Sequence, residues 1–271
     1  MRQKLLGLVG AALCGAALAM PAVAQTVVKI GLINSFTGFV AQAADEGEKG
    51  ADLYVKDHLK DLPPGVTLDI IKRDDTSNPA VGRRLAQELI TRDHVQLLTG
   101  IVLSPVAAAV APLTAQAKIP LVLDMASAGV EIPRLSPYVV RDTFTLWQVA
   151  YPIGKWAAAQ GWKTGYTAVT DFIAGHDAEA AFTKASTDAG GKIIDSVRYP
   201  PANPDFSPFV QRIRDAHPQV VFIFVPAGTQ AIAMMKAIKD FGLRRPAFIS
   251  PRRRTCCPTR ICRTWATSRW G

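Results

Sequence analysis

The sequence predicts an α/β protein made of two doubly wound, Rossmann-like lobes. Short apolar segments alternate with segments of helical period along most of the chain. This alternation occurs in two series, each the size of a domain, which meet near residues 141–145. We therefore divide the chain into a leader over residues 1–24, an N-terminal lobe over 25–143, a C-terminal lobe over 144–250 and a tail over 251–271.

The leader has the composition of an export signal. Arg2 and Lys4 precede an apolar run over residues 5–20, and Ala22-Val23-Ala24 forms a small-x-small cleavage motif. A membrane anchor is the alternative, but the apolar run is short for a span and ends in the cleavage motif. We expect cleavage after Ala24, a mature chain without stable membrane insertion, and a periplasmic location.

The first lobe is predicted to begin with a buried strand at residues 27–34, followed by a helix over 42–59. In that helix Ala44, Gly47, Ala51 and Val55 mark a small, close-packing face. A strand at 68–72 ends in the polar turn 73–77. Asn78 and Pro79 are the cap and the first residue of the next helix. Further strands are predicted at 96–99 and 120–125, with a helix opening at Ser104-Pro105 between them.

The second series follows a short segment at residues 138–141. Helices are expected over 146–159, 177–189 and 229–241, with another beginning at Ser207-Pro208. Strands are expected at 166–170, 192–198, 220–225 and 246–250. The strand at 220–225 is almost wholly apolar, which is typical of the centre of a parallel sheet. The repeated order of strand and helix predicts parallel sheets covered by helices in both lobes.

The tail differs from the rest of the chain. Residues 251–271 hold six arginines, three cysteines and no acidic residue, whereas residues 25–250 hold no cysteine. The change of composition is typical of translation in another reading frame, and it predicts a fold that is incomplete at the C-terminus. The net charge of +9 comes mainly from the tail and from Arg2 and Lys4, because without them 23 basic residues face 22 acidic ones. The body therefore gives no indication of nucleic-acid binding.

No pattern for catalysis or for a cofactor is present in the sequence. It contains neither GxGxxG, GxxxxGK[ST] nor GxSxG, and its four histidines lack the spacing of metal ligands. Asp74-Asp75 could serve acid–base chemistry, but a polar turn at a strand end explains the pair equally well. We therefore expect no enzyme, no cofactor and no metal site.

Loops at the ends of strands are the candidate ligand site, because doubly wound sheets bind small molecules there. Ser104 offers a hydroxyl, and the helix behind it presents backbone N–H groups at Val106 and its neighbour to a carboxylate. Ser104 could instead only cap its helix. The remaining candidates lie in three other loops. All are small residues except one, which is aromatic: Ala126, Ser127, Ala128, Phe172, Ala174 and Ala227.

Three segments carry a resemblance to a known family. They are KIGLINSFTG at residues 29–38, LLTGIVLSPVAAAVAPLTAQAKIPLV at 97–122, and ANPDFSPFVQRIRDAHPQVVFIFVPAGTQA at 202–231. Together they resemble the type I periplasmic solute-binding proteins of branched-chain amino acid ABC transporters. The resemblance implies two lobes that close on a small carboxylate, and delivery of that ligand to an inner-membrane ABC permease.

The same resemblance gives expected roles to individual residues. Ser104 matches the serine that holds the ligand carboxylate, and Ala126 and Ala128 match the loop that reads its amino and carboxyl groups. Ala128 and Ala174 stand where many members have threonine and an aromatic residue. VPAG at residues 225–228 is similar to subgroups that bind aromatic acids or amides. An amino acid is the first expected ligand and an aromatic acid the second.

Two alternatives to the transport receptor stay open at this stage. A ligand-sensing domain of the same fold could act through a signalling partner instead of a permease. The chain could also be a non-functional, truncated product, since the resemblance ends near Ser250 and Arg252 stands close to where amino-acid binders often have an acidic residue.

Overall fold

The computed structural model describes residues 25–129 and 132–243, and it divides into two compact units. Unit 1 ends at Thr145 and unit 2 begins at Leu146. The predicted leader, the tail and the strand at residues 246–250 lie outside the described residues. Within the described residues, no helix has both the length and the apolar character needed to cross a membrane.

Unit 1 is built on a five-stranded parallel sheet. Its strand order is β2-β1-β3-β4-β5, so the chain starts in the middle and adds strands on both sides. The strands are β1 (Thr26–Asn34), β2 (Val66–Asp74), β3 (Leu97–Gly100), β4 (Leu121–Leu123) and β5 (Val139–Arg141). All four strand pairs are parallel, so the carboxyl ends of the strands share one edge of the sheet.

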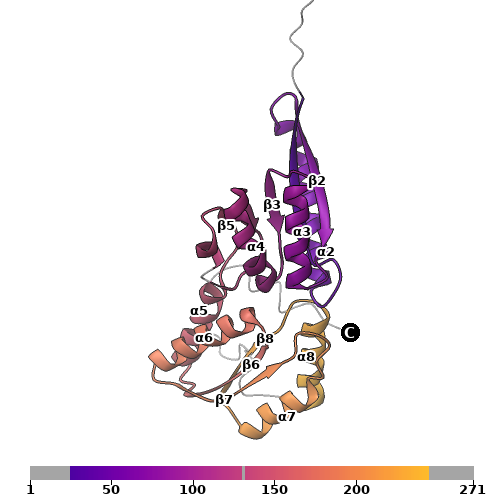
Figure 1. Cartoon of the computed structure of the whole chain (residues 1–271). Coiled ribbons are helices and arrows are strands. Elements are labelled where there is room, and N and C mark those ends of the chain that lie inside the picture. The colour runs from indigo at the N-terminus through magenta and orange to yellow at the C-terminus, as the bar shows by residue number, and fades with distance from the viewer. Residues whose placement is uncertain (1–24, 130–131, 244–271) are drawn as a thin grey trace, which may run out of the picture. The chain divides into compact units, whose positions relative to one another are not determined.

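Helices connect the strands of unit 1, as the figure shows (Figure 1). They are α2 (Ala41–His58), α3 (Pro79–Thr91) and α4 (Ser104–Ala117), with 3-10 turns η1 (Leu59–Asp61) and η2 (Ile132–Leu135). The Asn78 side chain accepts hydrogen bonds from the backbone N–H groups of Ala80 and Val81, at 2.9 and 3.4 Å, which confirms the predicted cap of α3.

Unit 2 has a three-stranded parallel sheet of order β7-β6-β8 in its described part. Its elements are α5 (Leu146–Ala159), β6 (Thr164–Thr170), α6 (Ile173–Asp188), β7 (Lys192–Tyr199), α7 (Ser207–Ala216), β8 (Val220–Phe224) and α8 (Thr229–Asp240). The order repeats that of β2-β1-β3 in unit 1. The predicted parallel α/β architecture is therefore confirmed in both units.

Each face of the sheet in unit 2 has its own apolar core. On one face, Tyr166, Val197 and Tyr199 pack with buried side chains of α7 and α8. On the other face, α6 packs on the strands, and the Phe182 ring stacks on Phe222 with centroids 4.6 Å apart. Helix α5 packs along α6.

Close packing of α5 on α6 depends on Gly154. A Cβ atom at this position would lie 2.7 Å from the Cβ of Ala185 and 2.8 Å from the carbonyl oxygen of Phe182. Any larger residue would therefore push the two helices apart. The bounds predicted for α5 from sequence, residues 146–159, agree with the structure.

Three predicted details differ from the structure. Helix α6 begins at Ile173 rather than at residue 177, so Ala174 belongs to a helix and not to a loop. Strand β2 extends to Asp74, which the sequence placed in a turn. Ala44 is buried in α2, but Ala51, which was expected on the same packing face, is exposed.

Candidate ligand-binding site

The candidate site in unit 1 starts where β3 ends. Gly100 and Ile101 both have positive φ angles, 95° and 67°. The N–H of Ile101 donates to the carbonyl oxygen of Ile33 at 2.7 Å, and a Cβ at Gly100 would lie 2.4 Å from that oxygen. In the structure this glycine is needed because the chain approaches β1.

Ser104 is the first residue of α4, and its side chain does not cap the helix. The capping position belongs to Leu103, and no side-chain capping bond is found there. Instead, the Ser104 Oγ accepts a hydrogen bond from the backbone N–H of Ala128 at 3.0 Å. A hydroxyl that accepts one hydrogen bond can still donate its proton. Ser104 is therefore able to bind an anion beside the N-terminus of α4, where the helix dipole favours negative charge.

The loop after β4 brings its backbone to Ser104. Ala126 and Ala128 are fully buried, and Ser127 is half-buried. The carbonyl oxygens of Ala128 and Gly129 accept hydrogen bonds from Nη2 of Arg141, at 2.8 and 2.9 Å. Unit 1 thus joins three predicted site residues, Ser104, Ala126 and Ala128, at one edge of the sheet. Val106 lies in the first turn of α4 and is fully buried.

The ends of β1 and β3 are tied together by Asn34, which the sequence analysis did not single out. Its Oδ1 accepts hydrogen bonds from the backbone N–H groups of Ser35 and Val102, both at 3.1 Å. Asn34 is 2% exposed. The bond to Val102 fixes the loop that leads into Ser104. Val102 lies 68 positions along the chain from Asn34, and this separation left no local signal in the sequence.

Asp74 and Asp75 follow each other at the end of β2, but the pKa of the first is lowered and that of the second is raised. Burial alone would raise the pKa of Asp74, but hydrogen bonds from the Thr37 hydroxyl and from the backbone N–H groups of Thr76 and Thr37 bring the pKa below its usual value. Burial raises the pKa of Asp75, although its Oδ1 accepts bonds from the Ser35 hydroxyl and the N–H of Ser77. The pair therefore shapes a turn, as one reading of the sequence proposed.

Asp75 is fully buried and only partly satisfied. Its Oδ2 has no hydrogen-bond partner in the part of the chain that the structure describes. A bare carboxylate oxygen in this position is costly, which is the physical reason why burial raises the pKa of Asp75.

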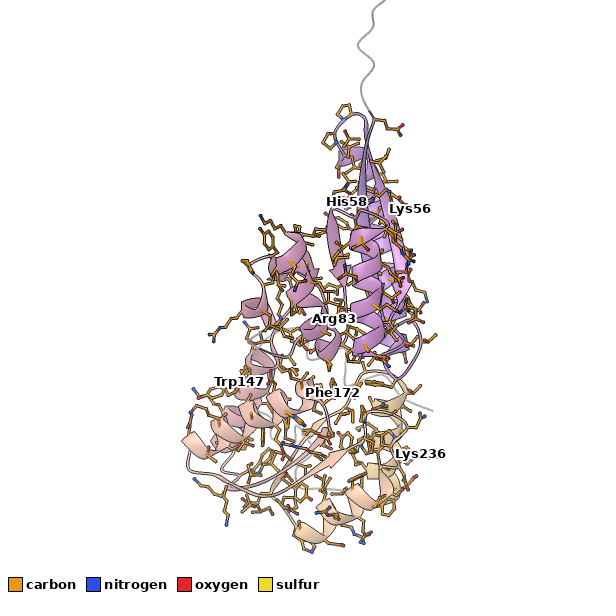
Figure 2. The ribbon with its side chains drawn as sticks, viewed as in Figure 1. Lys56, His58, Arg83, Trp147, Phe172 and Lys236 are labelled. Atoms are coloured by element: carbon orange, nitrogen blue, oxygen red, sulfur yellow. The ribbon has the colours of Figure 1, made fainter. Side chains whose placement is uncertain are left out.

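In unit 2, two predicted site residues lie near the ends of neighbouring strands. Phe172 lies at the start of α6 (Figure 2), and its ring is tilted against that of Phe224 with centroids 6.2 Å apart. Phe224 ends β8, and Ala227 follows in the exposed turn before α8. Ala174 is 5% exposed within the first turn of α6, and is thus buried as Ser104 and Ala128 are in unit 1.

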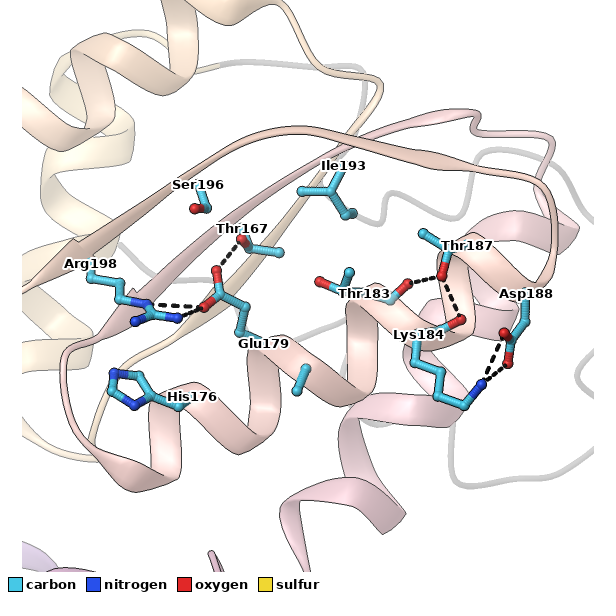
Figure 3. A pocket seen from close by; sticks show the side chains of 11 residues that line it. Thr167, His176, Glu179, Thr183, Lys184, Thr187, Asp188, Ile193, Ser196 and Arg198 are labelled. Atoms are coloured by element: carbon cyan, nitrogen blue, oxygen red, sulfur yellow. Dashed lines mark hydrogen bonds and ion pairs between the residues drawn. The ribbon is translucent and has the colours of Figure 1, made fainter.

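A groove of about 620 Å³ lies between α6 and the edge strand β7, which lines it from Ile193 to Arg198 (Figure 3). Its lysine and arginine are each paired, Lys184 with Asp188 at 3.0 Å and Arg198 with Glu179 at 2.8 Å, and the Nε2 of His176 lies 2.8 Å from the carboxylate of Asp171. Because these charges are balanced, the groove has no net preference for an anion. We do not include it in the candidate site.

Comparison with known proteins agrees with this arrangement. Residues 27–251 match the family model described as "Periplasmic binding protein". The chain belongs to the periplasmic binding protein family. This is a family of transporter substrate-binding proteins, so the expectation that the chain is not an enzyme is confirmed. Membership also confirms the resemblance inferred from the three sequence segments.

Relatives of this periplasmic binding protein are known by sequence and by structure. "Leu/Ile/Val-binding protein homolog 6" of Brucella melitensis is 40% identical over 228 residues, which are 84% of this chain and 58% of the relative. A solute-binding protein of an ABC transporter from Rhodopseudomonas palustris BisB5, in complex with 3,4-dihydroxybenzoic acid, is 41% identical with a TM-score of 0.76. That match covers 80% of this chain and 59% of the other. A solute-binding protein from R. palustris in complex with 4-hydroxybenzoate is 39% identical, with a TM-score of 0.76 and coverage of 80% and 59%. The chain thus spans less than two thirds of the length of these relatives.

Proposed function

We propose that this protein is the periplasmic receptor of an ABC importer, which captures a small carboxylate and delivers it to an inner-membrane permease. The observation that carries the proposal is the buried Ser104 hydroxyl at the N-terminus of α4, held by the backbone of Ala128. A hydroxyl donor and a helix N-terminus in one place form a site suited to a carboxylate group.

For the ligand we propose an aromatic acid of the hydroxybenzoate class. Two relatives near 40% identity are described in complex with hydroxybenzoic acids. The side chains of Ala126 and Ala128 add only methyl groups to the loop, and neither supplies an acceptor for an ammonium group. Ser127 supplies the only hydroxyl among the predicted site residues of this loop, and none of them is charged, which favours a carboxylate on an apolar ring over an ammonium group.

A branched-chain amino acid is the second candidate. The curated relatives are named as homologues of Leu/Ile/Val-binding proteins, which favours this class. An amino acid ligand requires a partner for its ammonium group, and an aromatic acid does not. The two classes are therefore separated by comparing an acid with an amino acid of similar apolar size.

Calorimetric titration of the mature chain, residues 25–271, tests the proposal. The ligands are 4-hydroxybenzoate, 3,4-dihydroxybenzoate, benzoate, Leu, Ile, Val and Phe. We expect saturable binding of the hydroxybenzoates. Loss of the hydroxyl in Ser104→Ala should cost about 1.5–3 kcal/mol, roughly ten- to 150-fold in Kd, because the bond is to a charged group.

Ser207→Ala is the matched control. Ser207 is also the first residue of a helix and also precedes a proline, but its backbone N–H bonds to Asp205 in unit 2. Its loss should leave the Kd unchanged. Binding by Ser104→Ala as tight as by the parent protein would remove Ser104 from the site, and binding of the amino acids alone would select the second ligand class.

We also propose that the protein is exported and cleaved after Ala24, on the basis of the leader sequence. The family membership agrees with a periplasmic location. Intact mass of the periplasmic fraction should show an N-terminus at Gln25, whereas a cytoplasmic product that retains Met1 would refute the proposal.

A further inference from the structure

The peptide group of Ala128 is held on both sides by side chains from other elements. Its N–H donates to the Oγ of Ser104 at 3.0 Å, and its carbonyl oxygen accepts from Nη2 of Arg141 at 2.8 Å. The same Nη2 also donates to the carbonyl oxygen of Gly129 at 2.9 Å. Ala128 is fully buried and Ser104 is 2% exposed, so these bonds form where water competes little for them.

Arg141 is well placed to hold this loop rigidly. It is the last residue of β5 and pairs with Leu123, the last residue of β4. The N–H of Asp142 also donates to the carbonyl oxygen of Leu123 at 2.8 Å. The loop leaves β4 and is held by a side chain from the strand beside it. A guanidinium group donates in a fixed planar geometry, so its two bonds restrict the orientation of the peptide planes.

The orientation of Ala128 in turn decides how the Ser104 hydroxyl is used. When the Ala128 N–H points at Oγ, it occupies one lone pair of the hydroxyl and leaves the proton to donate elsewhere. If the loop rotated, this hydroxyl could turn toward another acceptor. The effect of Arg141 on a bound carboxylate would therefore pass through Ala128 and Ser104.

We propose that Arg141 is a positioning residue for ligand binding, which holds the loop of residues 126–129 so that Ala128 fixes the Ser104 hydroxyl as a donor to the ligand carboxylate. The proposal rests on the function proposed above, since it assigns Arg141 a part in the same site. Arg141 need not contact the ligand in this arrangement.

A double-mutant cycle separates this role from a general effect on folding. The Kd for 4-hydroxybenzoate is measured for the parent protein, Arg141→Gln, Ser104→Ala and the double variant. We expect Arg141→Gln to weaken binding about tenfold when Ser104 is present, and about twofold or less when it is absent. Arg141→Lys should restore part of the loss, because an ammonium group can still donate to a carbonyl oxygen. Equal losses in both backgrounds would overturn the proposal.

Arg73→Gln provides the matched control in unit 1. Arg73 is also a half-buried arginine on a strand, but its guanidinium bonds to Asp93 at 3.0 Å. This variant should bind as the parent does. A loss in Arg73→Gln as large as in Arg141→Gln would mean that any damage to unit 1 weakens binding, which would also contradict the proposal.

Amide hydrogen exchange tests the arrangement without any ligand. Exchange of the Ala128 amide should become about tenfold faster in Arg141→Gln and in Ser104→Ala, and should not change in Arg73→Gln. If no acid binds to the parent protein, the proposed function fails while this measurement still decides whether Arg141 holds the loop. Unchanged exchange in Arg141→Gln would show that it does not.

Discussion

Helices α2 and α6 occupy the same place in the two units but differ in burial. Each follows the first strand of its unit and leads to the edge strand, β2 or β7. Helix α6 buries eight residues, among them Phe182, whereas α2 buries only Ala44. In α2, Leu53 is 60% exposed and Tyr54 is 64% exposed.

The difference lies in the second layer of helices. Helix α5 packs along α6, while no helix among the described residues packs along α2 in this way. Lys56 and His58 lie in the last turn of α2 (Figure 2), and the helix is held to β2 by ion pairs of Lys72 with Glu48 and Asp52. A helix position in a fold therefore does not decide how deeply the helix is buried. The neighbour that covers its outer face decides it.

The largest expected effect compares one aromatic residue on each helix. Phe182→Ala in α6 should lower the free energy of unfolding of unit 2 by about 3–5 kcal/mol, because the fully buried ring stacks on Phe222. Tyr54→Ala in α2 should change the stability of unit 1 by less than about 0.5 kcal/mol. Urea denaturation measures both effects. Trp147, Trp156 and Trp162 report on unit 2 by fluorescence, and circular dichroism follows the whole chain. Similar losses in the two variants would mean that α2 is covered as α6 is.

A smaller effect compares the ion pairs that join each helix to its edge strand. Glu179 is buried, and its carboxylate accepts bonds from the Thr167 hydroxyl at 2.6 Å and from Arg198 at 2.8 and 3.1 Å. We expect Glu179→Gln to cost about 1.5–3 kcal/mol. The Glu48 side chain is 21% exposed against 12% for Glu179, and Asp52 also contacts Lys72, so Glu48→Gln should cost about 0–1 kcal/mol. Denaturation of both variants at low and high salt checks this. Salt screens the exposed partners Lys72 and Arg198 alike, so the difference between the two substitutions should persist at high salt. An equal cost for both substitutions would contradict the comparison.

The smallest effect appears in the pH dependence at the ends of the two edge strands. Strand β7 ends in Tyr199, whose hydroxyl lies within hydrogen-bonding distance of the carbonyl oxygens of Ala168 and Phe224, and burial raises the pKa of this hydroxyl above its usual value. Strand β2 ends beside Asp75, whose pKa burial also raises. Because the folded pKa of Asp75 lies above the unfolded one, its contribution to stability is full below the unfolded pKa and is lost as pH rises through the folded pKa.

Asp75→Asn cannot lose a proton and should remove this dependence. The melting temperature of the variant, relative to the parent, should therefore rise between pH 4 and pH 8, as thermal melts at each pH would show. Asp74 has a lowered pKa and titrates in both proteins, so its opposite contribution cancels in the difference. A difference that stays constant over this range would mean that Asp75 titrates normally in the folded protein.

Local signals in the sequence predicted most of the fold. Asn78 followed by Pro79 gave the start of α3, and the periodic apolar residues gave α5 over its full length. The start of α6 was predicted four residues too late because Phe172, at its capping position, makes no side-chain capping bond. The prediction of the packing face of α2 was only partly right, because periodicity shows which residues share a face but not whether another element covers that face.

The candidate site was harder to predict because its bonds are not local. Ser104 could be singled out from its place before Pro105, but its bond to Ala128 spans 24 positions. The Ser35 hydroxyl reaches Asp75 across 40 positions, and Asn34 reaches the Val102 N–H across 68. Arg141 ends a strand with no motif around it, so only the folded chain reveals the two carbonyl oxygens that it contacts.

The positive φ angles of Gly100 and Ile101 limit which residues can occupy these two positions in a folded protein. At position 100, any side chain would collide with the carbonyl oxygen of Ile33, so a randomised library screened for folded protein should return glycine alone. Position 101 also has a positive φ, yet its side chain is fully buried. Strain of this kind costs on the order of 1–3 kcal/mol, whereas deleting a large aliphatic side chain from the core costs about 2–5 kcal/mol. At position 101 the cost of losing buried side-chain volume should therefore exceed the cost of backbone strain. The library should keep a large aliphatic residue at position 101, directly after a glycine at position 100.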